Sequence, residues 1–247
     1  MTQTYPEESV QALVSLDKNW WGRSKTVGPG SLVWAVAPYP EQKPRRLTVT
    51  SRGDDDRQHD SAAYHMEEFR VGDPPPKPST LPVAAMPLFD GESFLVQRGK
   101  RRPCLILVEP SEEIDRTLAR GQPRRHTART RLVLPYYSAN GTSSRGGWSP
   151  KLVARIKLCE YAQYFWDLLP LPSGSPEGSI LRLDHAFSIG RDPASIESTG
   201  YSLHPEALRV LEDQYLWYVT GTDQKRAAED TRFATARTIL REYAAGP

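Results

Sequence analysis

The sequence has few cysteines and no long apolar run, and both absences restrict what the chain can be. Only two of its 247 residues are cysteine, Cys104 and Cys159. Two isolated cysteines provide neither a disulfide framework nor the ligand spacing of a zinc site, so we expect a cytoplasmic protein without a bound metal. No stretch of about 18 apolar residues occurs, and the first residues do not combine a basic start with an apolar run. We therefore predict neither a membrane span nor a secretory signal.

Strong net charge and common catalytic patterns are absent as well. The formal net charge is +2, from 32 Lys and Arg against 30 Asp and Glu, so any binding to nucleic acid has to depend on local clusters of charge. The chain has no glycine loop of the kind that cradles phosphate and no Ser, His and Asp in the order of a hydrolase triad. We expect no cofactor.

A basic segment stands directly before an apolar run. Lys100, Arg101 and Arg102 precede Pro103, and residues 104–108 are all Cys, Leu, Ile or Val. Such a short apolar run is typical of a buried strand, and proline is tolerated where a strand begins. Three cations at the rim of a sheet suit the binding of phosphate. The alternative is that they are solvated charges before an ordinary strand.

A second basic segment covers residues 119–131, which contain five arginines and no acidic residue. It leads into a predicted strand over 130–134 and then to Tyr136 and Tyr137. Arginines beside tyrosines favour contact with phosphates and unpaired bases, and the alternative is a solvated loop beside two core tyrosines. The residues that we predict to bind nucleic acid are Lys100, Arg101, Arg124, Arg125, His126, Arg129, Arg131 and Tyr136.

The order of the predicted elements favours an α+β domain built on a small antiparallel sheet, because strands and helices alternate irregularly and the connections are mostly short. Residues 73–87 are rich in proline and predict an extended strap. His185 is interpreted as a structural residue, since Asp184 and His185 on one strand point to opposite faces. We predict strands over 31–37, 46–50, 64–71, 104–108, 130–134 and 179–184, and helices over 7–19, 111–120, 149–168, 203–219 and 224–243.

Several blocks of the sequence, taken in order, resemble the MazF/PemK-type toxin endoribonucleases of toxin–antitoxin pairs. The most specific is Arg102 before Pro103 and an apolar strand, which resembles the family's Arg-Pro signature. The family's catalytic Thr falls on Tyr137, with Ser138 next, and the Gln expected after Asp184 is His185. The other matching blocks are residues 30–36, 132–138, 179–189 and 203–208.

The resemblance implies an α+β fold in which a small antiparallel SH3-like barrel carries an inserted hairpin, the proline strap and added helices. On this basis we expect an N-terminal helical extension over 1–27, a barrel domain over 28–221 with an insertion at about 38–97, and a C-terminal helix over 222–247.

The resemblance also implies metal-independent cleavage of single-stranded RNA through attack by the ribose 2′-hydroxyl. Arg102 would hold the phosphate, and Tyr137 or Ser138 would donate a hydrogen bond to it. Implied protein partners are an antitoxin and a second copy of the chain. The alternative function is a non-catalytic module that binds nucleic acid or a peptide within a regulatory or defence assembly.

Overall fold

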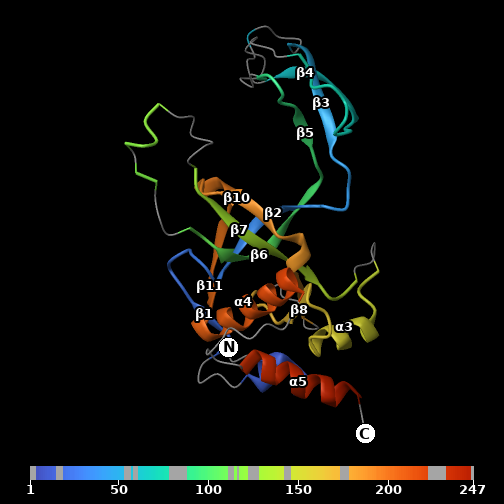
Figure 1. Cartoon of the computed structure of the whole chain (residues 1–247), viewed down its shortest axis with the longest axis vertical. Helices are drawn as coiled ribbons and strands as arrows, with labels where there is room; N and C mark the ends of the chain where they lie inside the picture. The colour runs from blue at the N-terminus through green and yellow to red at the C-terminus, as the bar shows by residue number, and fades with distance from the viewer. Residues whose placement is uncertain are drawn as a thin grey trace. The chain divides into compact units, whose positions relative to one another are not determined.

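The protein is described here from a computed structural model (Figure 1). The residues that it describes are 4–14, 19–52, 57, 61–77, 88–110, 114, 115, 117–121, 128–141, 146–172, 178–221 and 232–245. The chain divides into two compact units, residues 1–37 with 101–247, and residues 38–100. The second unit covers nearly the range at which the sequence predicts an insertion.

Residues 38–100 contain a small antiparallel sheet in the order β4-β3-β5. Its strands are β3 (Arg45–Arg52), β4 (Ala62–Glu68) and β5 (Phe94–Val96). The strands predicted over 46–50 and 64–71 correspond to β3 and β4, which pair with each other. Arg46 fixes one end of this sheet, because its Nε lies 2.8 Å from Glu67 Oε1. Most of the proline-rich segment lies outside the described residues.

The larger unit is built on an antiparallel sheet whose paired strands run β1-β11-β2-β6-β7-β9-β8, with β10 paired to β7. The predicted α+β class with antiparallel pairing is confirmed. Among the described strands no pairing joins β1 to β8. The strands are β1 (Trp21–Arg23), β2 (Ser31–Pro38), β6 (Gly99–Val108), β7 (Thr130–Ser138), β8 (Tyr164–Asp167), β9 (Ser179–Arg182), β10 (Phe187–Gly190) and β11 (Glu197–Leu203).

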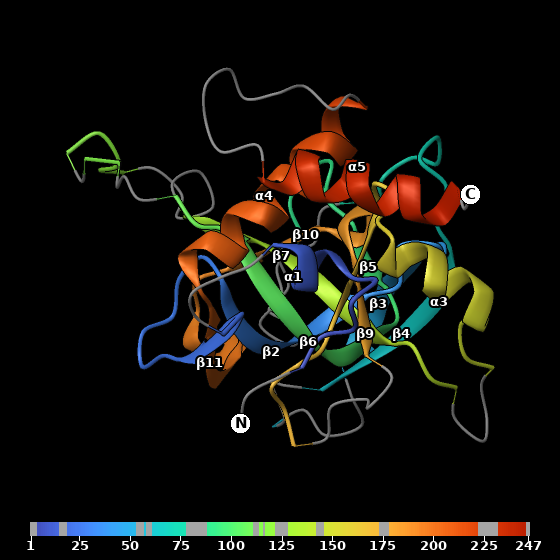
Figure 2. The same ribbon diagram turned by 90° about the horizontal axis from the view of Figure 1, so that it is seen from below.

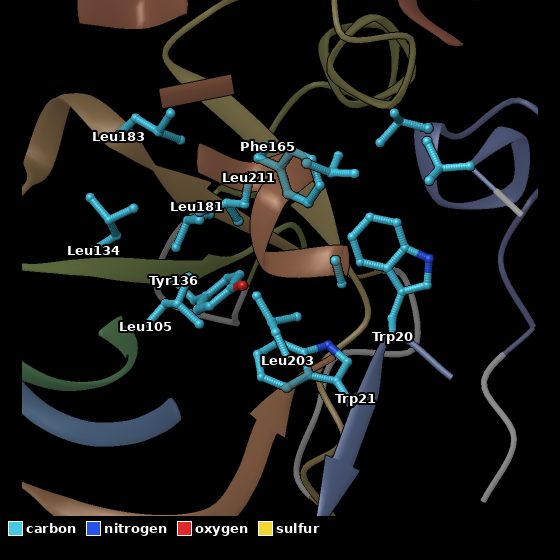
Figure 3. Close-up of a cluster of buried hydrophobic side chains, with 14 of the residues drawn as sticks. Trp20, Trp21, Leu105, Leu134, Tyr136, Phe165, Leu181, Leu183, Leu203 and Leu211 are labelled. Carbon is cyan, nitrogen blue, oxygen red and sulfur yellow. The ribbon is translucent and has the colours of Figure 1, made fainter. Parts of the chain in front are cut away.

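One face of this sheet carries the main core. Successive side chains of a strand point to opposite faces, so Leu105, Leu134 and Leu181 come together from three neighbouring strands (Figure 3). Trp20, Phe165 and Leu211 pack on them. Burial of so many large apolar side chains provides most of the stabilisation of this unit.

Helices cover the main core, and the C-terminal ones follow the sequence predictions closely. α1 (Val10–Leu13), α4 (Pro205–Thr220) and α5 (Arg232–Ala245) all contribute buried apolar residues to it (Figure 2). α4 begins with Pro205 in the first turn, where proline is favoured, and ends at Gly221, whose φ of 66° is left-handed. No helix among the described residues is long and apolar enough to cross a membrane.

The opposite face of the sheet carries two smaller apolar clusters. Val33, Cys104, Ile106 and Val133 form the β10 cluster, against which Phe187 and Ile189 of β10 pack. Ala139, Ile156, Trp166 and Ile180 form the α3 cluster, named after α3 (Pro150–Lys157).

The helix predicted over 7–19 is present only at Val10–Leu13 among the described residues, and the helix predicted over 149–168 is mostly wrong. The helix expected over 149–168 ends at Lys157, Cys159 has a left-handed φ of 51°, and residues 164–167 form β8. As a strand, this segment sends Phe165 into the main core and Trp166 into the α3 cluster. Of the residues predicted to form a helix over 111–120, the described ones are not helical, and residues 117–120 make a turn.

Candidate functional site: an arginine–tyrosine cluster

The alternation of β6 and β7 places Arg102 and Tyr137 on the same face of the sheet. Cys104 pairs with Pro135 and Ile106 with Val133, and these residues face the β10 cluster. Arg102 lies two residues before Cys104, and Tyr137 lies two residues after Pro135. Both side chains therefore project from that face as well. The Arg102 guanidinium carbon lies 4.0 Å from the centre of the Tyr137 ring. This stacked contact is a cation–π interaction that fixes both groups.

β9 adds a second arginine to this face. Tyr137 pairs with Ile180, so Arg182, two residues beyond Ile180, projects toward the same side. Its guanidinium carbon lies 5.8 Å from the centre of the Tyr137 ring. The Tyr137 ring is therefore flanked by two guanidinium groups.

The turn after β9 brings an acid and a histidine to Arg182. Residues Leu183–His185 form a 3₁₀ turn, η1, in place of a continued strand. Arg182 donates to both carboxylate oxygens of Asp184, at 2.7 and 2.6 Å, and lies 2.6 Å from Nε2 of His185. The prediction that Asp184 and His185 point apart on one strand is thus wrong, because both side chains reach the same guanidinium.

The contacts of His185 define its tautomer. Guanidinium nitrogens only donate, so Nε2 accepts from Arg182, and the proton of the neutral ring lies on Nδ1. Nδ1 is 2.7 Å from the Tyr137 hydroxyl oxygen and donates to it. The Tyr137 ring also meets the imidazole edge to face, with centroids 5.4 Å apart. We call Arg102, Tyr137, Arg182, Asp184 and His185 the arginine–tyrosine cluster.

The cluster carries net positive charge, with two guanidinium groups against one carboxylate. Burial opposes the charge of Arg182, but the hydrogen bonds and the charge of Asp184 outweigh it and raise the pKa of Arg182 above its usual value. All five side chains are partly exposed. A fixed, accessible and cationic group of this kind suits the binding of phosphate.

The other basic residues near the start of β6 have different positions. Arg101 points to the opposite face, where its guanidinium carbon lies 4.3 Å from the centre of the Trp34 ring and its NH2 lies 2.6 Å from Glu197. Lys100 is exposed and belongs to the unit of residues 38–100. Ser138 is exposed and its Oγ accepts from the backbone N–H of Asn140. Of the predicted catalytic residues, only Arg102 and Tyr137 are in contact with each other.

Two predicted nucleic-acid contacts need correction. Tyr136 is 2% exposed within the main core (Figure 3), and its hydroxyl donates to Asp167 at 3.1 Å. Its ring cannot stack on a base. Arg131 is 7% exposed, and its Nε donates to Glu109 at 3.1 Å, an acid that Arg191 also contacts. Arg131 is therefore part of an ion-pair network with Glu109, just after β6, and the exposed Arg191, just after β10.

Of the other predicted contacts in the basic segment, Arg129 is the one that lies among the described residues. Arg129 is half-buried, and its NH1 donates to the carbonyl of Pro110 at 3.1 Å. The predicted contacts Arg124, Arg125 and His126 lie outside the described residues.

Sequence reasoning missed Arg182 and Asp184, and it interpreted His185 as structural. A signal was present, because Arg182, Asp184 and His185 are three polar residues directly after an apolar strand. This signal places the three residues beside Tyr137 only when the register that pairs Tyr137 with Ile180 is known. Within the described ranges, no group of three or more His, Cys, Asp or Glu side chains is placed to hold a metal ion.

No protein-family model, curated protein or solved structure matches the chain.

Proposed function

We propose that this protein binds single-stranded RNA at the arginine–tyrosine cluster and cleaves it by metal-independent attack of a ribose 2′-hydroxyl on the adjacent phosphate. The observation that carries the proposal is the contact between Arg102, Tyr137, Arg182 and His185 on one face of the sheet. These four groups supply the two requirements of this reaction, a positive charge near phosphorus and groups that move protons.

The two arginines would stabilise the charge that develops on the phosphate. Attack on phosphorus increases the negative charge on the non-bridging oxygens, and a fixed guanidinium stabilises that charge more than it stabilises the ground state. Arg102 is held by the Tyr137 ring and serves as the main clamp. When the substrate binds, the hydrogen bond that Arg182 donates to the His185 imidazole is replaced by one to a phosphate oxygen.

The proton transfers then form a relay. Nε2 of His185, released by Arg182, accepts the proton of the 2′-hydroxyl as the bond from the 2′-oxygen to phosphorus forms. Nδ1 passes its proton to the Tyr137 hydroxyl, 2.7 Å away, and Tyr137 gives its own proton to the 5′-oxygen as the bond from phosphorus to that oxygen breaks. The products are a 2′,3′-cyclic phosphate and a 5′-hydroxyl, and both side chains end neutral.

The position of the cluster supports a MazF/PemK-type relationship. Arg102 stands before Pro103 at the start of the buried part of β6, and Tyr137 lies at the end of the neighbouring β7, where the family has its Thr. We also propose that the sheet belongs to a small SH3-like barrel, as the resemblance implies. An antitoxin and a homodimer stay predictions.

The proposal is tested by incubating the purified chain with a long unstructured RNA and with the same strand carrying 2′-O-methyl groups, both in excess chelator. We expect cleavage of the RNA and none of the methylated strand, because methylation removes the nucleophile. Cleavage of both strands would contradict 2′-hydroxyl attack, and an intact RNA would contradict the proposed activity.

A non-catalytic binding module is the second candidate, and a specific observation favours it. Both ring nitrogens of His185 are hydrogen-bonded within the cluster, and Asp184 occupies two donors of Arg182. A cluster satisfied in this way is stable without substrate. The two functions are separated by expression in cells, since an endoribonuclease should arrest growth whereas a binding module should be tolerated while still shifting RNA in a gel.

A further inference from the structure

Two aromatic rings lie beside Arg182, on the side away from Tyr137 along the sheet. The Arg182 guanidinium carbon is 5.1 Å from the centre of the Tyr164 ring and 5.9 Å from that of Trp148. Tyr164 pairs with Arg182 across β8 and β9. Because one guanidinium lies near Tyr137 and near these rings, the aromatic pair is adjacent to the arginine–tyrosine cluster.

The backbone fixes Trp148 in this place. The N–H of Trp148 donates to the carbonyl of Ala139, just beyond the end of β7, at 3.1 Å. Gly147 makes this approach possible, because a Cβ on it would lie 2.3 Å from the backbone nitrogen of Gly141. Trp148 is thus held next to the sheet by a close contact between two backbone segments.

The three rings meet edge to face. Trp148 and Tyr164 meet at 83° with centroids 5.4 Å apart, and Tyr161 meets Tyr164 at 69° with centroids 6.1 Å apart. In an edge-to-face pair, the ring that presents its edge has neither face covered by its partner. All three rings pack against the α3 cluster, and all three remain partly exposed.

The charges around the rings suit a nucleotide. Arg182 lies beside two of the rings, and Arg155 of α3 has its guanidinium carbon 5.1 Å from the centre of the Tyr161 ring. Glu160 pairs with Arg155, and Asp184 pairs with Arg182. Aromatic faces next to arginines bind unpaired bases by stacking while the cations contact the phosphates.

We infer that Trp148, Tyr164 and Tyr161 form a subsite that stacks one unpaired nucleobase of the strand whose phosphate lies at Arg102 and Arg182. This inference rests on the proposed function for the placement of the phosphate, and it adds the part of the substrate that is recognised. The subsite selects single-stranded over duplex RNA, because a paired base cannot expose its face to a ring.

The test compares binding of two uncleavable 2′-O-methyl oligonucleotides, one with all its bases and one with abasic residues in their place. We expect the wild-type chain to bind the complete strand more tightly. Trp148→Ala should weaken binding of the complete strand about five- to a hundredfold, within the range for loss of one base–aromatic stack, and leave binding of the abasic strand unchanged. Trp34→Ala, which removes the arginine-stacked ring on the opposite face, is the matched control and should leave both affinities unchanged.

The outcomes separate this inference from the proposed function. Equal binding of the two strands by the wild-type chain, or equal losses for both strands in Trp148→Ala, would overturn the base subsite whatever the cleavage assay shows. Absence of RNA cleavage, with the expected difference between the strands, would overturn the activity and leave the subsite standing. If Trp148→Ala does not fold, Trp148→Leu keeps apolar volume at the site without an aromatic ring and answers the same question.

Discussion

At the residue scale, the composition of the site is determined by which face of a strand each side chain occupies. Arg101 and Arg102 are neighbours in sequence and both stack on an aromatic ring, yet Arg101 stacks on Trp34 and Arg102 on Tyr137, on opposite faces. The sequence shows a basic segment but not which of its cations share a site. Tyr136 and Tyr137 divide in the same way, with Tyr136 in the main core and Tyr137 in the cluster.

Tyr137→Phe tests the proton relay. The variant keeps the ring on which Arg102 stacks, so we expect RNA binding within about twofold of wild type. Loss of a positioned proton donor typically lowers the rate about a hundredfold or more, and we expect a loss of that size in single-turnover cleavage. Undiminished cleavage by Tyr137→Phe would remove the Tyr137 hydroxyl from the mechanism.

Asp167 should make the stability of the protein depend on pH. It is fully buried and accepts from Tyr5, Trp21 and Tyr136. Burial raises the pKa of Asp167 from 3.8 to about 7, although the hydrogen bonds oppose the shift. The folded state therefore holds this proton at a pH where the unfolded chain has lost it. The resulting stabilisation of the fold is fully present below about pH 4, and it is lost as the pH rises to about 7.

We expect the free energy of unfolding of the wild-type chain to fall by a few kcal/mol, relative to that of Asp167→Asn, as the pH rises from about 4 to about 7. Urea denaturation at a series of pH values measures this difference. A difference between the two chains that stays constant with pH would show that Asp167 titrates alike in the folded and unfolded states.

At the element scale, β7 organises the site because it pairs with β6, β9 and β10. The sequence predicted its start, and the strand continues through Pro135 to Ser138. The structure of the segment 149–168 could not be predicted from periodicity. Its apolar residues would surround a helix on all sides, and such a pattern fits either a buried helix or a strand packed between two cores. This segment contacts two apolar clusters and turns at Cys159, which has a left-handed φ. Both features depend on the tertiary structure and not on the local sequence.

Gly178→Ala tests the close packing that joins β9 to β8. Gly178 has a φ of +95°, and a Cβ there would lie 2.3 Å from Nε1 of Trp166, a buried ring. Positive φ and overpacking each cost on the order of 1–3 kcal/mol, so we expect a loss of roughly 2–4 kcal/mol in chemical denaturation. Gly190→Ala is the control, because its Cβ would meet nothing within 4 Å. Equal stability of the two variants would contradict this packing.

At the scale of the whole molecule, the net charge is only +2, so any binding of RNA would depend on local groups of charge. The strands β2, β3, β4, β6, β7 and β9, the antiparallel class of the sheet and the C-terminal helices could be predicted because apolar runs, prolines and glycines mark them locally, whereas β1, β5, β8, β10 and β11 were not predicted. The arginine–tyrosine cluster could be predicted only in part, since it joins residues from β6, β7, β9 and η1 through a register that no local pattern specifies.

The salt dependence of binding measures how many cations contact phosphates. For a single strand, the logarithm of the affinity should fall with the logarithm of salt concentration with a slope near −0.7 per phosphate contact. Replacing Arg124 and Arg125 by Ala should flatten the slope by about one unit or more. The melting temperature should change little, since we expect both arginines to be exposed. An unchanged slope in the folded double variant would place the RNA elsewhere.

Analysis of the RNA ends tests most directly whether Arg102 stabilises the transition state of 2′-hydroxyl attack. We expect the wild-type chain in excess chelator to produce 2′,3′-cyclic phosphate and 5′-hydroxyl ends. Arg102→Ala should lose about a hundred- to a thousandfold in rate, the usual effect of removing one electrostatic stabiliser, whereas Arg101→Ala, with the same loss of charge on the opposite face, should cleave at nearly the wild-type rate. Ends that carry 3′-hydroxyl and 5′-phosphate groups, or equal cleavage by the two variants, would contradict this role of Arg102.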